Sequence, residues 1–409
     1  MDICLAPTEV ERRTNVCDWH ISPLPHENLC IIISKWESYD LKRERMEQIM
    51  IRVGMLTSGG DCQALNATMR GVAKSLYKTY GDEVEIIGFE DGYKGLIYAD
   101  YRIMKPSDFS GILTKGGTIL GTSRQPFKQM RVPDENGLDK VEAMKHTYKK
   151  LKLECLVVLG GNGSQKTANL LREEGLNIVA LPKTIDNDLW GTEMTFGFQS
   201  AVNVATAAID GIHTTAASHG RVFIVEVMGH KVGWLTLHAG IAGGADIILI
   251  PEIPYDINVI VAALKERNKQ GKRFSILAVA EGAISKEDAK LSKKELKEKK
   301  KERVSYPSVA YELSAKIQEL SGQEVRVTVP GHTQRGGEPC PYDRVLSTRL
   351  GAYGAKLIMA REYGYMVCMK DGEIDKVPLE SVAGKLKTVD PGCSIIQEAK
   401  MLGISFGDE

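Results

Sequence analysis

The sequence lacks a cysteine framework. Its eight cysteines are spread thinly along 409 residues, and no two of them form a CxxC pair. The pattern gives neither a zinc spacing nor a set of disulfides, so it predicts a protein of the reducing cytoplasm. No run approaches the roughly 18 uninterrupted apolar residues of a membrane-spanning helix, and we expect no membrane partner. The apolar run Leu29–Ile33 is too short for a secretory signal.

The sequence also lacks a surplus of charge and is poor in aromatic residues. Its 53 Lys and Arg residues balance 53 Asp and Glu residues, and aromatics make up 6% of the chain. A general nucleic-acid or membrane-surface binder carries a basic excess, so neither partner is expected and any phosphate must be bound locally. The 40 glycines gather at strand-to-helix junctions, where backbone N–H groups can hold a phosphate.

Two segments differ from the rest of the chain. Residues 1–49 show no clear period, and Met50 would make a plausible initiator, so we expect a poorly ordered N-terminal extension. Residues 286–303 hold nine basic and five acidic residues among eighteen, which predicts a solvated helix or a mobile loop. A nucleic-acid patch is the weaker alternative there, because the acids are interleaved and no aromatic accompanies them.

From Met50 onward, short apolar runs, glycine-rich turns and helix-like stretches alternate, which predicts an α/β fold with parallel sheets and crossover helices. Ligands of such sheets lie beyond the carboxyl ends of the strands, so the loops there are the candidate site. The predicted strands are Arg52–Leu56, Glu85–Phe89, Cys155–Leu159, Ile178–Leu181, Val222–Val227, Ile247–Ile250 and Ser275–Ala280. The predicted helices are Asn66–Tyr77, Ser164–Glu174, Phe198–Ala217, Lys231–Ala242 and Asn258–Lys269.

Two glycine-rich loops each follow a predicted strand and precede a predicted helix. The first is Thr57–Asp61 and the second is Leu159–Thr167. The free N–H groups at the amino end of a helix can hold a phosphate. One such loop can be a packing device, but two in one sheet indicate a nucleotide or a pyrophosphate. The GxxxxGK[ST] spacing of a Walker loop is absent.

A third segment, Pro182–Asp188, places two carboxylates, a hydroxyl and an ammonium at the end of another predicted strand. In phosphoryl transfer a protein must orient the acceptor hydroxyl, accept its proton and neutralise the transferring charge. A carboxylate beside a cation suits that task. The alternative is structural, with Asp188 capping the next turn and Asp186 paired to Lys183, and it fits Asp188 better than Asp186.

Together these motifs resemble those of the phosphofructokinase family. GGDxxxxN follows the first strand, and GTSR, GGNGS, PKTIDND, RVFIVEVMGH and PGHTQRGG follow in the family's order. The resemblance covers Met50 to about Lys370. It implies two doubly wound, mostly parallel-sheet domains with the active site in the cleft between them. The phosphoryl-donor domain would comprise 50–197 with part of 334–385, the fructose 6-phosphate domain 198–333, and a C-terminal tail 386–409.

The resemblance also implies roles for individual residues. Asp186 would accept the proton of the 1-hydroxyl of fructose 6-phosphate, with Thr184 and Ile185 beside it. Arg124 and Lys183 would stabilise charge on the transferring phosphoryl group, although Arg124 could instead form a surface salt bridge. The donor would be bound by Gly59, Gly60, Arg124, Gln125, Gly161, Asn162, Gly163 and Ser164.

The acceptor site follows from the same resemblance. The sugar phosphate would lie against Met228, Gly229, His230, Glu281, His332 and Arg335. Arg221 and Arg326 would reach in from a neighbouring subunit, so a homotetramer or homodimer is expected. Arginine and histidine side chains together suit a phosphate dianion.

Three donor-site positions depart from the commonest bacterial pattern. Asn162 replaces the aspartate associated with Mg²⁺, and its neutral amide can face the metal but adds no charge. Mg²⁺ would then be held mainly by the donor phosphates, or by Asp61 or Asp186. Gly163 leaves room for ATP where pyrophosphate-using relatives tend to carry an aspartate. Lys183 is the pyrophosphate-type residue, and this mixture resembles the mixed-substrate group, in which Gly with Lys usually goes with ATP.

The leading hypothesis is therefore a glycolytic, ATP-dependent 6-phosphofructokinase, a phosphotransferase with an alcohol acceptor that produces fructose 1,6-bisphosphate. Its nearest rival uses pyrophosphate with the same acceptor. NAD or lipid kinases share a GGDG-type loop but would not need PKTIDND or HTQRGG. A non-catalytic sugar-phosphate-binding subunit draws only on Asn162, and the intact Asp186, Arg124 and Thr184 argue against it.

Overall fold

Two sheets organise the chain in the computed structural model, which describes residues 50–302 and 306–409. The predictions for residues 1–49 and for residue 303 lie outside these ranges. The first sheet has the order β11-β10-β5-β4-β1-β2-β3, with the outer strands β11 and β3 antiparallel to their neighbours and the others parallel. Its strands are β1 (Ile51–Ser58), β2 (Val84–Phe89), β3 (Tyr101–Met104), β4 (Cys155–Gly160), β5 (Ile178–Pro182), β10 (Tyr365–Lys370) and β11 (Glu373–Pro378).

The second sheet is wholly parallel and has the order β7-β8-β6-β9. Its strands are β6 (Val222–Val227), β7 (Ile247–Leu249), β8 (Ser275–Ala280) and β9 (Val325–Thr328). Both sheets lie within the compact unit Ile51–Glu409. The predicted α/β class with two mostly parallel sheets is confirmed.

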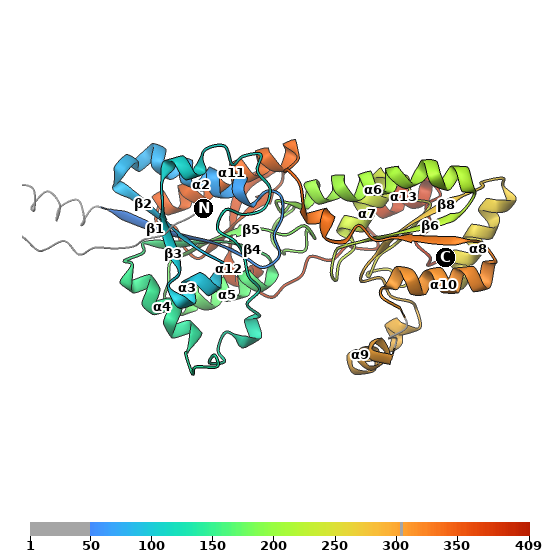
Figure 1. The fold of residues 1–409 in the computed structure, drawn as a ribbon, viewed down its shortest axis with the longest axis horizontal. Coiled ribbons are helices and arrows are strands. Elements are labelled where there is room, and N and C mark those ends of the chain that lie inside the picture. Colours follow the sequence, from blue (N-terminus) through green and yellow to red (C-terminus); the bar gives the residue numbers. More distant parts are fainter. Residues whose placement is uncertain (1–49, 303–305) are drawn as a thin grey trace, which may run out of the picture. The chain divides into compact units, whose positions relative to one another are not determined.

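Helices cover both faces of each sheet (Figure 1). On the first sheet, α2 (Leu65–Tyr80) and α11 (Pro341–Met359) cover one face, and α3 (Tyr93–Tyr98), α4 (Lys140–Lys150) and α5 (Asn162–Glu173) cover the other. On the second sheet, α6 (Phe198–His219), α7 (Trp234–Ala242) and α13 (Ser394–Met401) lie opposite α8 (Ile257–Lys269) and α10 (Val309–Ser321). Strands buried on both faces explain the continuous apolar runs that made them predictable.

Shorter elements complete the described chain. They are α9 (Lys293–Glu302), α12 (Leu379–Val382) and the 3₁₀ turns η1 (Gly81–Glu83), η2 (Pro106–Phe109), η3 (Phe127–Gln129), η4 (Asp288–Lys290) and η5 (Gly331–Arg335). Most of the charged segment that begins at residue 286 is therefore helical, as α9. In the described ranges, no helix combines the length and the apolar character that crossing a bilayer would need.

The predicted strands and helices are all present, with ends displaced by a few residues. The strands that the patterns do not predict are β3, β9, β10 and β11. Three of these lie at sheet edges, where one side of the strand meets solvent and polar residues interrupt the apolar run. β11, for example, reads EIDKVP and has no fully buried residue.

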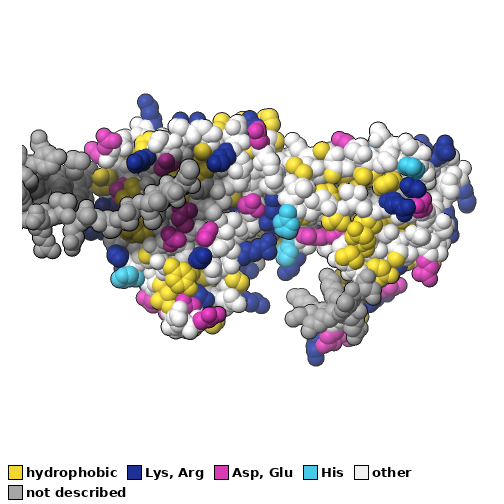
Figure 2. Space-filling view, in the orientation of Figure 1, with side chains coloured by type: hydrophobic (Ala, Val, Ile, Leu, Met, Phe, Trp, Pro, Cys, Tyr) yellow, Lys and Arg dark blue, Asp and Glu magenta, His cyan; other side chains and the backbone are white. Residues whose placement is uncertain are grey.

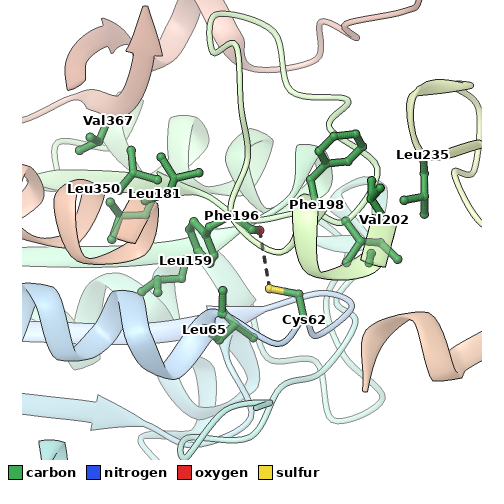
Figure 3. Close-up of a cluster of buried hydrophobic side chains, with 14 of the residues drawn as sticks. Cys62, Leu65, Leu159, Leu181, Phe196, Phe198, Val202, Leu235, Leu350 and Val367 are labelled. Atoms are coloured by element: carbon green, nitrogen blue, oxygen red, sulfur yellow. Dashed lines mark hydrogen bonds between the residues drawn. The ribbon is translucent and has the colours of Figure 1, made fainter. Parts of the chain in front are cut away.

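Tight packing fixes the loop after β1 to the chain that enters α6 (Figure 3). Burial raises the pKa of Cys62 to about 12, so its thiol stays protonated and donates to the carbonyl of Phe196, 3.7 Å away. Gly197 has φ +98°, and a Cβ there would meet Cys62 Sγ at 2.6 Å, so only glycine fits. The first glycine-rich loop is therefore held against the segment that follows PKTIDND.

Residues after α12 pass from the first sheet to the second. Leu386 forms a bridge with Leu189, and Lys387 N–H donates to the carbonyl of Asp188 at 2.9 Å. Farther on, Ile248 N–H donates to the carbonyl of Ser405 at 2.9 Å. Backbone hydrogen bonds thus hold the segment 386–409 to the residues after β5 at its start and to β7 of the second sheet near its end, while the predicted domain boundaries stay predictions.

Candidate functional site

A cavity of about 930 Å³ gathers most of the predicted site residues. It is lined by loops that follow β1, β4 and β5 of the first sheet and β6 and β8 of the second. The carboxyl ends of parallel strands thus meet around it, as the fold class predicts. The predicted residues that line it are Gly59, Gly60, Arg124, Gln125, Gly161, Asn162, Gly163, Ser164, Lys183, Thr184, Ile185, Asp186, Met228, His230, Glu281 and Arg335.

Four predicted residues do not line this cavity within the described chain: Gly229, His332, Arg221 and Arg326. His332 is exposed in η5. Arg221 Nε donates to Glu324 at 2.5 Å, and Arg326 contacts the same carboxylate, so both guanidinium groups are paired next to edge strand β9. That Arg221 and Arg326 bind the sugar phosphate of a neighbouring subunit stays a prediction.

The first glycine-rich loop lies against the GTSR segment. Gly59 has φ +87°, its N–H donates to the carbonyl of Ser123 at 3.1 Å, and its carbonyl accepts from Thr122 Oγ1 at 2.8 Å. A Cβ on Gly60 would overlap the guanidinium of Arg335. The two positions therefore require glycine for different reasons. Gly59 adopts the left-handed backbone of a turn, and Gly60 leaves room for the close approach of a cation.

Lys183 brings its ammonium to the place where the two glycine-rich loops meet. Its Nζ donates to the carbonyl of Gly60. A Cβ on Gly59 would lie 3.7 Å from Nζ, and one on Gly161 would lie 3.2 Å from the Lys183 carbonyl. Burial lowers the pKa of Lys183, and the carboxylate of Asp186 partly opposes that effect. The glycines thus leave room for a buried cation as well as for a ligand.

Asp186 follows β5 and faces the cavity. Its N–H donates to Thr184 Oγ1 at 3.0 Å, and the Thr184 carbonyl accepts from Thr195 Oγ1 at 2.8 Å, which fixes the turn. Burial raises the pKa of Asp186 to about 7, and the neighbouring Asp188 adds to the rise, while Arg335 opposes it. A carboxyl group with that pKa can accept a proton near neutral pH.

Asp188 also lines the cavity, although the sequence favours a structural role for it. Burial raises its pKa, and in the described ranges its Oδ1 is buried without a hydrogen-bond partner. A buried polar atom of this kind calls for a ligand that the protein itself does not provide. The second carboxylate of PKTIDND therefore belongs to the site.

The second sheet contributes to the cavity the turn after β6 and Glu281, which follows β8. Glu281 Oε1 accepts from the N–H of His230 at 2.7 Å and from that of Gly229 at 3.4 Å. His230 has φ +53°, and this carboxylate holds the backbone there. The N–H of Met228 donates to Gln334 Oε1 at 3.2 Å, which joins the turn after β6 to η5.

Some of the remaining lining residues belong to the predicted loops, and the others carry no sequence signal of their own. Lysines on helices and turns have the pattern of ordinary surface residues, and only the fold shows that they face the cavity. Figure 2 shows Lys and Arg side chains gathered beside His and acidic ones, between the elements of the first sheet and those of the second. The additional lining residues are Ser58, Asp61, Pro126, Phe127, Lys128, Lys166, Asp188, Lys231, Gly384 and Leu386.

Among the residues that the structure describes, the cavity offers oxygen ligands for a metal but no complete metal site. In the described chain, His, Cys, Asp and Glu side chains form no group of three or more that could hold an ion by themselves. Asn162 Nδ2 donates to the carbonyl of Lys385 at 2.6 Å, so the amide is engaged in holding the chain. Asp61 is half-exposed, 4.0 Å from Arg335. This oxygen-rich but incomplete set fits Mg²⁺ that arrives on phosphates.

Comparisons with known proteins agree with this geometry. A family model described as phosphofructokinase matches residues 52–358. The ATP-dependent 6-phosphofructokinase of Spirochaeta thermophila is 56% identical over 87% of this chain and 97% of the relative. ATP-dependent 6-phosphofructokinase 3 of Bacteroides thetaiotaomicron is 45% identical over 87% of this chain and the whole relative. The solved phosphofructokinase of Saccharomyces cerevisiae matches with a TM-score of 0.68 and 30% identity, over 81% of this chain and 45% of that one.

Proposed function

The chain belongs to the phosphofructokinase family, and we propose that it transfers the γ-phosphoryl group of ATP to the 1-hydroxyl of fructose 6-phosphate. The products are ADP and fructose 1,6-bisphosphate. The observation that supports this most is the place of Asp186, a carboxyl group between two phosphate-binding loops on one side and the Met228–His230 turn on the other. Relatives that are named for ATP as the donor support the choice of donor.

The proton of the reacting hydroxyl goes to Asp186. As the 1-oxygen of the sugar forms its bond to the γ-phosphorus, the carboxylate accepts the proton and the bond from that phosphorus to the β,γ-bridging oxygen breaks. Thr184 Oγ1 holds the N–H of Asp186, so the carboxylate keeps its direction. Lys183 and Arg124 place positive charge beside the phosphates, where negative charge shifts during transfer.

Mg²⁺ would enter with the donor phosphates and neutralise part of their charge. Asp61 and Asp188 are the carboxylates that would hold it, since one is partly exposed in the cavity and the other has a buried oxygen without a partner in the described chain. Asn162 would contribute its amide oxygen alone. This division leaves Asp186 free for the proton.

The acceptor phosphate would be bound by side chains of the second half of the site. Arg335 and His230 line the cavity, and Arg221 and Arg326 would complete the site from another copy of the chain. We therefore propose a homodimer or homotetramer in the cytoplasm. What supports the cytoplasm is the thin spread of the cysteines, and what supports the assembly is the family resemblance, since Arg221 and Arg326 do not line the cavity of their own chain.

Initial rates with purified protein, fructose 6-phosphate and Mg²⁺ test the proposal, with ATP and pyrophosphate compared as donors. We expect turnover with ATP, because the open position at Gly163 accepts a nucleotide, and a rate at least about 100-fold lower with pyrophosphate, because that donor lacks the nucleoside contacts that help to bind and orient ATP. Faster turnover with pyrophosphate would make Lys183 the deciding residue. Silence with both donors would instead support a non-catalytic sugar-phosphate-binding subunit.

The value of kcat/KM for fructose 6-phosphate should also rise with pH. Asp186 must be ionised to accept a proton, and its pKa is raised to about 7, so kcat/KM for fructose 6-phosphate should rise with pH and level off above about 8. Asp188 adds to the raised pKa of Asp186, so a change at Asp188 should shift the pH at which the rate rises. A profile that is flat between pH 6 and 8 would contradict the assignment.

A further inference from the structure

Gln63 occupies a buried position between the first glycine-rich loop and η5. Its side chain is fully buried. Both hydrogens of its amide are used: Nε2 donates to the carbonyl of Gln334 at 3.0 Å and to that of Gly336 at 3.0 Å. These two carbonyls flank Arg335 in the chain, so one glutamine side chain holds the backbone on both sides of the arginine.

A second glutamine extends the connection to the other sheet. Gln334 is also fully buried, its Oε1 accepts from the N–H of Met228 at 3.2 Å, and its Nε2 donates to the carbonyl of Gly331 at 3.1 Å. The backbone that carries Arg335 is thus tied to the loop after β1 through Gln63 and to the turn after β6 through Gln334. These contacts join the donor and acceptor sides of the cavity.

Within the described part of the chain, the guanidinium of Arg335 is held only weakly by contacts of its own. In the described ranges its Nε is buried without a hydrogen-bond partner, and its recorded ion pair is the 4.0 Å contact with Asp61. The group lies against Gly60, where a side chain would overlap it. Its position therefore depends on where the backbone of residues 334–336 is held.

We infer that Gln63 is a positioning residue for sugar-phosphate binding, which sets the Arg335 guanidinium by donating to the carbonyls on either side of it. The inference rests on the proposed function, because it takes Arg335 as a ligand of the phosphate of fructose 6-phosphate. Gln63 itself is fully buried and does not line the cavity. Cys62, next to it, fixes the same loop to the entry of α6, so the loop that carries Gln63 is itself held in place.

The variant Gln63→Met keeps the length and burial of the side chain and removes both donors. We expect its KM for fructose 6-phosphate to rise by about tenfold or more, with the KM for ATP changed less than about twofold and kcat lowered only a few-fold. Binding of fructose 6-phosphate without ATP, measured by calorimetry, should weaken by the same factor. If Gln63→Met does not fold, Gln63→Ala leaves room for a water that can donate to both carbonyls, and its KM should rise less.

Gln165 offers a matched control. It is equally buried and its Nε2 likewise donates to two backbone carbonyls, those of Gly160 at 2.8 Å and Leu181 at 3.2 Å. Gln165→Met should lower the melting temperature about as much as Gln63→Met does. It should raise the KM for fructose 6-phosphate far less than Gln63→Met does, because it does not contact the backbone around Arg335, and the larger effect of this loop residue should fall on the KM for ATP.

A double-mutant cycle separates positioning from general destabilisation. In an Arg335→Ala background, adding Gln63→Met should change the affinity for fructose 6-phosphate less than about twofold, since the group that Gln63 positions is gone. An equal loss in both backgrounds, or an unchanged KM in Gln63→Met, would overturn the inference. A wild-type protein that binds fructose 6-phosphate but shows no turnover would count against the proposed function alone, and the calorimetric cycle would still decide the role of Gln63.

Discussion

Replacing Asp186 with asparagine is expected to lower kcat by about 10³- to 10⁴-fold, while KM for fructose 6-phosphate stays within about threefold. The amide has the same shape as the carboxylate, and the N–H of residue 186 keeps its bond to Thr184 Oγ1. What disappears is the proton acceptor. The loss should therefore appear in the chemical step, as measured by single-turnover rates with saturating ATP.

The stability of Asp186→Asn provides the control. The pKa of Asp186 is raised from 3.8 to about 7 in the folded protein, so between those values the folded state binds more protons than the unfolded chain. Stability from this group is thus lost as pH rises from about 4 to 7. The neutral variant escapes that loss, and its melting temperature at pH 8 should be no lower than that of the wild type. A rate reduced less than tenfold would show that another group accepts the proton.

The pH dependence of the residual activity of Asp186→Asn tests whether Asp186 is the group that titrates near pH 7. If Asp186 causes the rise in kcat/KM with pH, the limb near 7 should be absent from the variant. The phosphate of the substrate titrates near pH 6 by itself and would leave a weaker limb there in both proteins. A limb near 7 that survives in Asp186→Asn would assign the titration to Asp188 or to another group.

The residues that sequence alone could place share a physical property. Asp186, Gly59 and Asn162 each lie within four residues of the end of a strand whose apolar run is long enough to predict, and the carboxyl ends of parallel strands meet in one place. Local pattern and topology are then sufficient to bring them together. The turn Met228–His230 follows the same rule from the second sheet.

The residues that could not be placed depend on contacts between distant parts of the chain. Lys128 lies in η3 and Leu386 follows α12, and each reaches the cavity only through the packing of whole elements. Gln63 reads as an unremarkable loop residue, since the carbonyls that it holds lie some 270 positions away. Asp188 resembles a turn cap until the burial of its Oδ1 is known. Contacts between such distant residues leave no periodic pattern in the local sequence from which they could be predicted.

Donor choice should change most with Gly163→Asp. Gly163 lies in the first turn of α5 and lines the cavity, and a Cβ there would meet nothing within 4 Å, so a side chain can enter without disturbing the fold. A carboxylate near the amino end of a helix is tolerated by the helix dipole. It would nevertheless occupy the space left for the nucleotide and repel its phosphates. We expect kcat/KM for ATP to fall by about 10²- to 10³-fold.

Two matched variants distinguish the causes of that loss. Gly163→Ala adds volume without charge and should lower kcat/KM for ATP by less than about fivefold, because the position is open. Gly211→Asp places the same carboxylate on α6 at an exposed glycine whose Cβ also meets nothing within 4 Å, and it should not affect the rate. If Gly163→Asp loses ATP turnover while pyrophosphate turnover is kept or gained, the open position decides the donor and Lys183 acts as an auxiliary charge. Equal losses with both donors would mean that repulsion of phosphate, rather than exclusion of the nucleotide, explains the effect.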